Sequence, residues 1–147
     1  MRITSIIAGA LLGLIFFASG AVVLFKLVPM PPLPPTGTPP GDFMAAFAPT
    51  GYMTFVKLFE IIGGLLVAFP KTRRAGLLVL GPIIINILAF HGFVERSGLF
   101  SPFLLAIVAV TLFLVWVERA AFAQFLFGSP REVSRVSVPS APAEVAQ

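Results

Sequence analysis

Long apolar stretches alternate with short polar or proline-rich connections along this chain. Four of the stretches are long enough to cross a bilayer, because about 20 apolar residues in a helix span its hydrocarbon core. We expect these spans at about residues 3–28, 51–69, 75–93 and 102–117. Short connections place neighbouring helices side by side, so the pattern predicts an all-α integral membrane protein, an antiparallel four-helix bundle within residues 1–127.

The first span lies at the N-terminus and carries three glycines on one face. Gly9, Gly13 and Gly20 form a surface of small residues that favours close helix packing and, as an alternative, a dimer interface. Small residues at Ala18 to Ala21 also fit a signal-peptide cleavage site. Because the apolar run continues past that point to the length of a tilted span, we interpret it as an uncleaved helix.

The first two spans are joined by a proline-rich segment, residues 29–50. Proline removes backbone donors and favours an extended course, so this segment predicts an outer loop. Within it, Asp42 can cap a short apolar turn that runs to Ala48 on the membrane surface. A ligand for a proline-recognition domain is the alternative interpretation.

Turn and tail signals complete the expected architecture. Gly81 and Pro82 predict a kink in the third span, and Ser101 with Pro102 predicts the start of the fourth. Residues 128–147 lack an apolar period and predict a disordered tail.

Basic residues predict the orientation, because cytoplasmic flanks of membrane spans are enriched in lysine and arginine. One side of the expected bundle carries most of them, and the other carries Arg96 and Lys26. Both termini, including the tail, are therefore expected in the cytoplasm. The residues on the basic side are Arg2, Lys71, Arg73, Arg74, Arg119, Arg131 and Arg135.

Composition agrees with a membrane protein and excludes several mechanisms. The chain is 58% hydrophobic and 11% charged, and its mean hydropathy is +1.02. The formal charge of +4 does not indicate nucleic-acid binding, since the basic residues lie at segment ends and not on one face. Without cysteine, the chain has no disulfide, thiolate metal site or iron–sulfur cluster. Its single histidine excludes bis-histidine haem, and no metal site is expected.

The second span carries the strongest functional signal. Lys57 and Glu60 are three residues apart and share one helix face, so each lowers the cost of burying the other. Gly63 and Gly64, one turn further on, allow a neighbouring backbone to approach closely.

Three other polar residues are expected in the same outer layer of the bundle, while the inner half is almost purely apolar. Asn86 and His91 lie in the outer half of the third span, and Lys26 ends the first. The layer predicts an outward-opening pocket in which Glu60 and Asn86 form the close pair, with His91 near the mouth. Residues five apart point about 140° from each other on a regular α-helix, so Asn86 and His91 face one ligand only if the helix is irregular. A purely structural polar network, with Lys26 extending to the interface, is the alternative.

Several short motifs resemble those of the DoxX-like family of small bacterial membrane proteins. They are Gly13-Leu14-Ile15-Phe16 with Gly20, VPMPPLPP at 28–35, GYM at 51–53, EIIGGLL at 60–66, PIIINI at 82–87 and Phe90-His91. The resemblance covers about residues 2–119, and Glu60, Asn86 and His91 match the polar positions of the family. It implies four helices in a bacterial inner membrane and, in some members, quinone-linked redox work.

These features lead to three functional hypotheses. The first is a membrane subunit that binds a quinone or another lipophilic ligand in the outer pocket and receives electrons through a partner oxidoreductase subunit. A complete enzyme is not expected, because the chain has no redox group of its own. The second is a small transporter or ion-conducting homo-oligomer built around Lys57 and Glu60, and the third is a membrane anchor for a soluble partner.

Overall fold

The computed structural model describes residues 2–29, 32–96 and 98–127, and every regular element in this part of the chain is helical. The predicted all-α class is therefore confirmed. The predicted tail, residues 128–147, lies outside the described residues. In chain order the elements are α1 (Arg2–Leu24), α2 (Pro39–Phe47), the 3-10 turn η1 (Ala48–Thr50), α3 (Tyr52–Ala68), α4 (Arg73–Ala89), the π-helix η2 (Phe90–Glu95), α5 (Pro102–Val117) and α6 (Arg119–Phe127).

Two stretches of the described chain are long and apolar enough to cross a membrane as they stand. They are α1 and the continuous segment Arg73–Glu95, each of 23 residues. Two bent pairs pass the same test together: α2 and η1 with α3, at 83°, and α5 with α6, at 65°. The described part of the chain thus has two membrane-length helices, or up to four if each bent pair forms one span.

The predicted spans agree with the helices at some ends and differ at others. The fourth span matches α5 at both ends, with the Ser101 Oγ accepting a hydrogen bond from the Leu104 N–H at 3.3 Å. The first span was predicted to reach residue 28, but α1 ends at Leu24. The chain turns there, and Lys26 adopts a left-handed conformation with φ of 51°. The apolar run therefore continues four residues beyond the helix.

The proline-rich segment contains a real helix and not only the predicted short turn. α2 begins at Pro39, and its N-cap is Thr38, whose Oγ1 accepts from the Gly41 N–H at 3.3 Å. The prediction that Asp42 is the capping residue is therefore wrong. Asp42 lies in the first turn, and its carboxylate accepts from the Gly37 N–H at 2.8 Å. The two side chains together stabilise the start of a nine-residue helix.

The third span is one helix that changes its hydrogen-bond pattern near its end. α4 continues through Pro82 to Ala89, and the pattern becomes π-helical at Phe90. π-helical segments are rare and are frequently found at functional sites.

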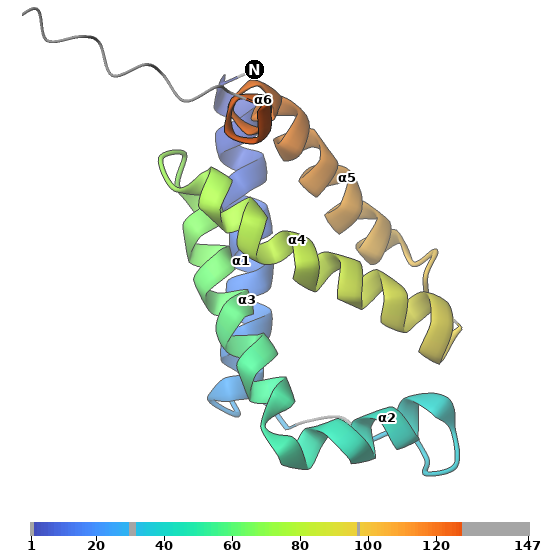
Figure 1. Ribbon diagram of the computed structural model, residues 1–147. Helices are drawn as coiled ribbons and strands as arrows, with labels where there is room; N and C mark the ends of the chain where they lie inside the picture. The colour runs from blue at the N-terminus through green and yellow to red at the C-terminus, as the bar shows by residue number, and fades with distance from the viewer. Residues whose placement is uncertain (1, 30–31, 97, 128–147) are drawn as a thin grey trace, which may run out of the picture.

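The glycine faces pack α1 directly on α3, as predicted. A methyl group added to Gly64 would lie 2.7 Å from the Gly13 carbonyl oxygen and 2.8 Å from the Phe17 nitrogen. One added to Gly20 would lie 2.7 Å from the Lys57 carbonyl oxygen. Because these neighbours are backbone atoms, only glycine permits the observed approach. α1 and α3 lie side by side along their lengths (Figure 1).

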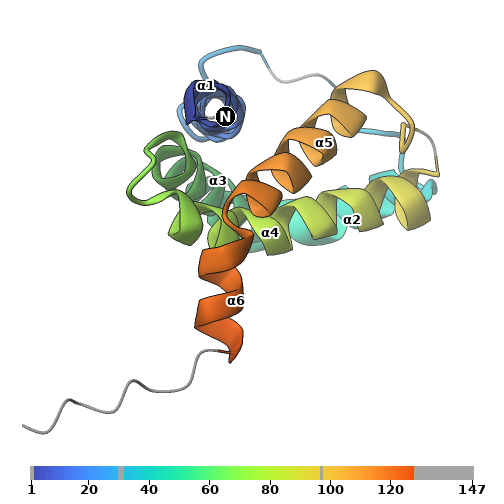
Figure 2. The same cartoon turned by 90° about the horizontal axis from the view of Figure 1, so that it is seen from above.

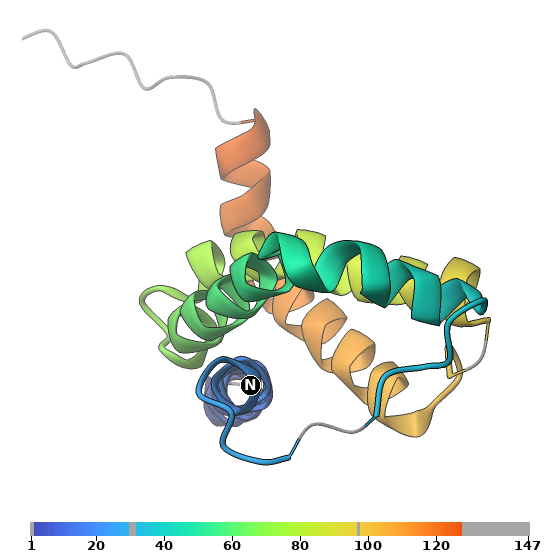
Figure 3. The ribbon, with the colours of Figure 1, turned by 90° about the horizontal axis from the view of Figure 1, so that it is seen from below.

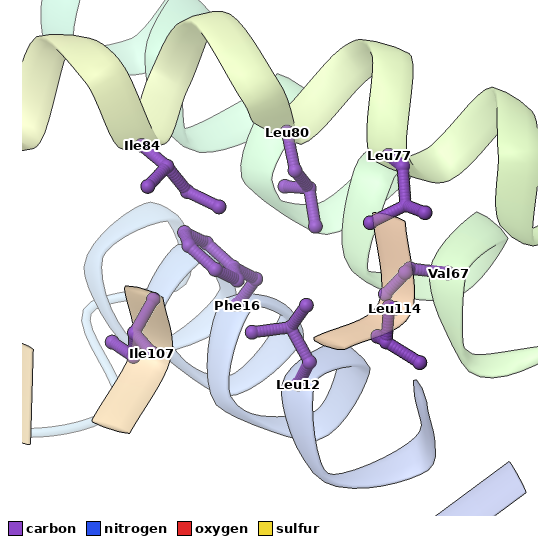
Figure 4. Packing of buried hydrophobic residues seen from close by; sticks show 8 residues of the cluster. All are labelled: Leu12, Phe16, Val67, Leu77, Leu80, Ile84, Ile107 and Leu114. Carbon is purple, nitrogen blue, oxygen red and sulfur yellow. The ribbon is translucent and has the colours of Figure 1, made fainter. Parts of the chain in front are cut away.

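The remaining helices diverge from this pair (Figures 1 and 2). α4 crosses away from α1 and α3, and α5 returns towards the start of α1. The core lies where the four helices approach one another, and Figure 4 shows its side chains pointing into a common centre. Fully buried members come from all four helices: Leu12, Val67, Leu80 and Leu114. By contrast, α6 extends away from the rest of the molecule (Figure 3).

Candidate functional site

A cavity of about 370 Å³ lies where α2, the first half of α3 and the end of α4 meet. Figure 1 shows these three elements around one region of the molecule. Most of its lining is apolar, and its volume falls in the range of small-molecule sites. The lining residues are Val23, Phe43, Met44, Tyr52, Met53, Val56, Lys57, Glu60, Asn86, Ile87, Phe90 and His91.

An ion pair lies at the polar end of the cavity. The Lys57 ammonium donates to both carboxylate oxygens of Glu60, at 2.8 and 2.9 Å. The Glu60 side chain is only 3% exposed, whereas Lys57 is 22% exposed. The charge on the carboxylate is thus compensated locally, as the spacing of the two residues predicts.

Ser19 on α1 completes this group and was not foreseen from the sequence. The Lys57 Nζ also donates to the Ser19 Oγ at 3.2 Å, so its three donors have three acceptors. The only available signal was that Ser19 precedes Gly20, the point at which α1 approaches the Lys57 carbonyl. The serine therefore fixes the lysine across the α1–α3 contact.

Asn86 and His91 line the same cavity as Glu60, as predicted. Both Glu60 oxygens accept from Lys57, and within the described residues no hydrogen bond joins Asn86 to Glu60. Asn86 is largely exposed and forms part of the wall. Its amide is therefore available to a bound molecule.

Asn86 lies on α4, and His91 lies one residue into η2, which begins at Phe90. Both line the same cavity, although residues five apart point about 140° from each other on a regular α-helix.

The imidazole has two fixed neighbours. Nδ1 lies 2.8 Å from the Ile87 carbonyl oxygen, and Nε2 lies 3.3 Å from a carboxylate oxygen of Glu95. Because the carbonyl only accepts, Nδ1 carries a proton. His91 also lines a second, outer depression with Arg96 and Ser101, so it lies between the cavity and the adjacent surface.

Lys26, the fifth candidate, does not belong to this cavity. It follows the end of α1, is exposed, and lines a separate groove with Leu27 and Val28. The difference follows from α1 ending at Leu24, which directs the chain away from the ion pair. The predicted grouping therefore holds for four residues from two spans, which line one cavity. Lys26, the contribution expected from the first span, lies outside it. The four residues in the cavity are Lys57, Glu60, Asn86 and His91.

Aromatic rings form the wall that α2 contributes. Phe43 lies 5.1 Å from Phe90 and 4.6 Å from Phe47, measured between ring centroids, and Phe47 lies 5.1 Å from Tyr52. These contacts connect α2 to η2 and to the start of α3. The proline-rich segment therefore supplies one side of the cavity, in addition to connecting two helices.

A second buried charge lies at the opposite end of the molecule, where an almost purely apolar interior was predicted. Arg73 is 2% exposed and packs against Gly9, and its nearest carboxylate oxygen, from Glu118, is 3.9 Å away. Glu118 also accepts from Arg74 at 2.8 Å. Both arginines were interpreted only as orientation signals, because their shared partner Glu118 lies far away in the sequence, 44 residues from Arg74.

The cavity combines an apolar wall with a few grouped polar atoms. The Asn86 amide can donate to a ligand or accept from it, and the Glu60 carboxylate can accept a proton or a hydrogen bond. The Lys57 ammonium can donate to a ligand that replaces Ser19. Comparison of the chain with protein-family models, with curated proteins and with solved structures finds no match.

Proposed function

We propose that this protein binds a quinone, or another lipophilic molecule with a compact polar headgroup, in the cavity between α2, α3 and the end of α4. The observation that carries the proposal is an apolar cavity of about 370 Å³ that ends on the Lys57–Glu60 ion pair. A headgroup carbonyl can accept from the Asn86 amide, or from Lys57 if it displaces the Ser19 hydroxyl, and the apolar wall suits a ring and the beginning of a tail. Glu60 can accept a proton from a headgroup hydroxyl.

The proposal includes a place in the membrane. We infer an antiparallel bundle of four spans in a bacterial inner membrane, with both termini in the cytoplasm. Its support is the two membrane-length helices, the two bent pairs that pass the same test, and the basic residues at one end. Figure 1 supports it too, since the start of α1 and helix α6 lie at the same end.

The family resemblance fits this reading. We propose membership of the DoxX-like family, and a role as a membrane subunit that passes its ligand to or from a partner oxidoreductase. Glu60, Asn86 and His91 match polar positions of that family, and all three line the cavity. The partner would supply electrons, because the chain contains no redox group.

Lipid-inclusive mass spectrometry of the purified protein tests the ligand. We expect a quinone or a related lipophilic molecule to copurify above its level in the bulk membrane extract. Val56→Trp fills the cavity without altering the ion pair, and should abolish the enrichment. Leu58→Trp, on the exposed face of the same helix, should retain it. No enrichment in the unmodified protein, or equal enrichment in both variants, would contradict the proposal.

A further inference from the structure

A small groove lies at the other end of the molecule, between the start of α1 and the joint of α5 with α6. It has a volume of about 200 Å³ and is lined by Arg2, Ser5, Phe113, Trp116, Val117 and Arg119. The end of α5 returns towards the start of α1 (Figure 1). The groove shares no lining residue with the cavity described above.

Its polar side is basic. Two arginines from different helices, Arg2 and Arg119, line it, and none of its six lining residues is acidic. The nearest acidic residue in sequence, Glu118, is engaged by Arg73 and Arg74. The start of α1 adds the positive end of a helix dipole. Guanidinium groups match the geometry of phosphate oxygens, so the charge of this groove favours a phosphate-bearing ligand.

Its other side is apolar and continues along the molecular surface. Trp116 is 62% exposed, with the Arg119 guanidinium 4.4 Å from its ring centre, and Arg119 donates to the Trp116 carbonyl at 2.8 Å. Leu112, one turn earlier on α5, is 63% exposed. Tryptophan is enriched at the level of lipid headgroups, and exposed leucines of a membrane span contact acyl chains.

We propose that this groove binds an anionic phospholipid, with the phosphate on Arg2 and Arg119 and an acyl chain along Trp116 and Leu112. The occupant is identified by the combination of two unlike surfaces at one place: two guanidinium groups, and an exposed apolar strip along α5. Free inorganic phosphate satisfies only the first of these, and the cationic headgroup of a zwitterionic lipid is repelled by the two arginines.

Trp116 allows a direct measurement, since it is the single tryptophan of the chain. The full-length protein is reconstituted in phosphatidylcholine vesicles at physiological salt, and part of the lipid is replaced by brominated phosphatidylglycerol or brominated phosphatidylcholine. Bromine atoms quench tryptophan fluorescence only at short range, so the quenching reports lipid bound next to Trp116. We expect the brominated anionic lipid to compete for the site roughly tenfold better than the zwitterionic one. Equal quenching by the two lipids would overturn the proposal.

Variants that remove one positive charge distinguish binding in the groove from general electrostatic attraction of anionic lipid to the basic end of the protein. Arg2→Gln or Arg119→Gln should lower the preference for the anionic lipid about fivefold. Lys71→Gln removes the same charge at the same end but lies outside the groove, and should leave the preference unchanged. Because the preference is a ratio for one protein, it is insensitive to any change in intrinsic fluorescence when Arg119 leaves the Trp116 ring. An equal loss in Lys71→Gln would mean diffuse attraction and would refute the site.

Discussion

At the scale of single residues, the distinctive feature is a carboxylate that is almost completely buried but not isolated. Glu60 is 3% exposed, and Lys57 supplies hydrogen bonds to both of its oxygens. A buried ion pair adds little net stability, yet removing one partner leaves an uncompensated charge. The ion pair is therefore better explained by a role in ligand binding in the cavity than by a contribution to stability.

The pair predicts an asymmetric pattern of stability changes. Lys57→Leu leaves the buried carboxylate without its donor and should reduce the free energy of unfolding by about 3 kcal/mol. Glu60→Leu should cost less, about 2 kcal/mol, because Lys57 is partly exposed and keeps Ser19 as an acceptor. The double variant should lose less than the sum of the single losses. Unfolding in detergent measures all three, and strictly additive losses would show that the residues are not coupled.

At the scale of elements, apolar patterning predicted the helices well because a spanning helix is long and nearly uniform. α5 was predicted at both ends, and the Gly9, Gly13 and Gly20 face correctly predicted the packing of α1 on α3. Helix ends were less predictable where no cap marks them. Residues 25–28 are apolar except for Lys26, and a single lysine near the membrane surface does not show that α1 ends at Leu24.

Backbone geometry and long-range pairs account for most of what the sequence did not reveal. The π-helix at Phe90–Glu95, which contains His91, has no residue signature. Likewise, Lys57 and Glu60 were recognised as a pair because they are three residues apart. The Lys57–Ser19 contact and the Arg73–Glu118 pair were not recognised, since the two residues of each lie far apart in the sequence.

At the scale of the whole molecule, the two polar sites lie at opposite ends of a largely apolar structure. The Lys57–Glu60 cavity adjoins α2, whereas Arg73 and Glu118 lie near the start of α1 and the α5–α6 joint. If the basic end faces the cytoplasm, the cavity opens towards the outer half of the membrane. The orientation therefore decides from which side a ligand or partner reaches the site.

Cysteine labelling tests this orientation on a chain that has no cysteine of its own. Thr36→Cys, in the exposed connection before α2, should react with an impermeant maleimide in intact cells. Gln124→Cys, exposed on α6, should react only after the membrane is opened. The unsubstituted chain serves as the blank. The reverse pattern would place both termini outside and move the cavity to the cytoplasmic half.

The most direct test of the ligand proposal is to map where a photoreactive quinone attaches. An azido-benzoquinone with a short alkyl tail is added to the reconstituted protein and irradiated, and the modified peptides are identified by mass spectrometry. We predict adducts on cavity residues of three separate elements, Met44, Met53 and Ile87, that disappear with excess unmodified quinone. Labelling confined to lipid-facing residues such as Phe103 and Leu112, and undiminished by the competitor, would contradict the account.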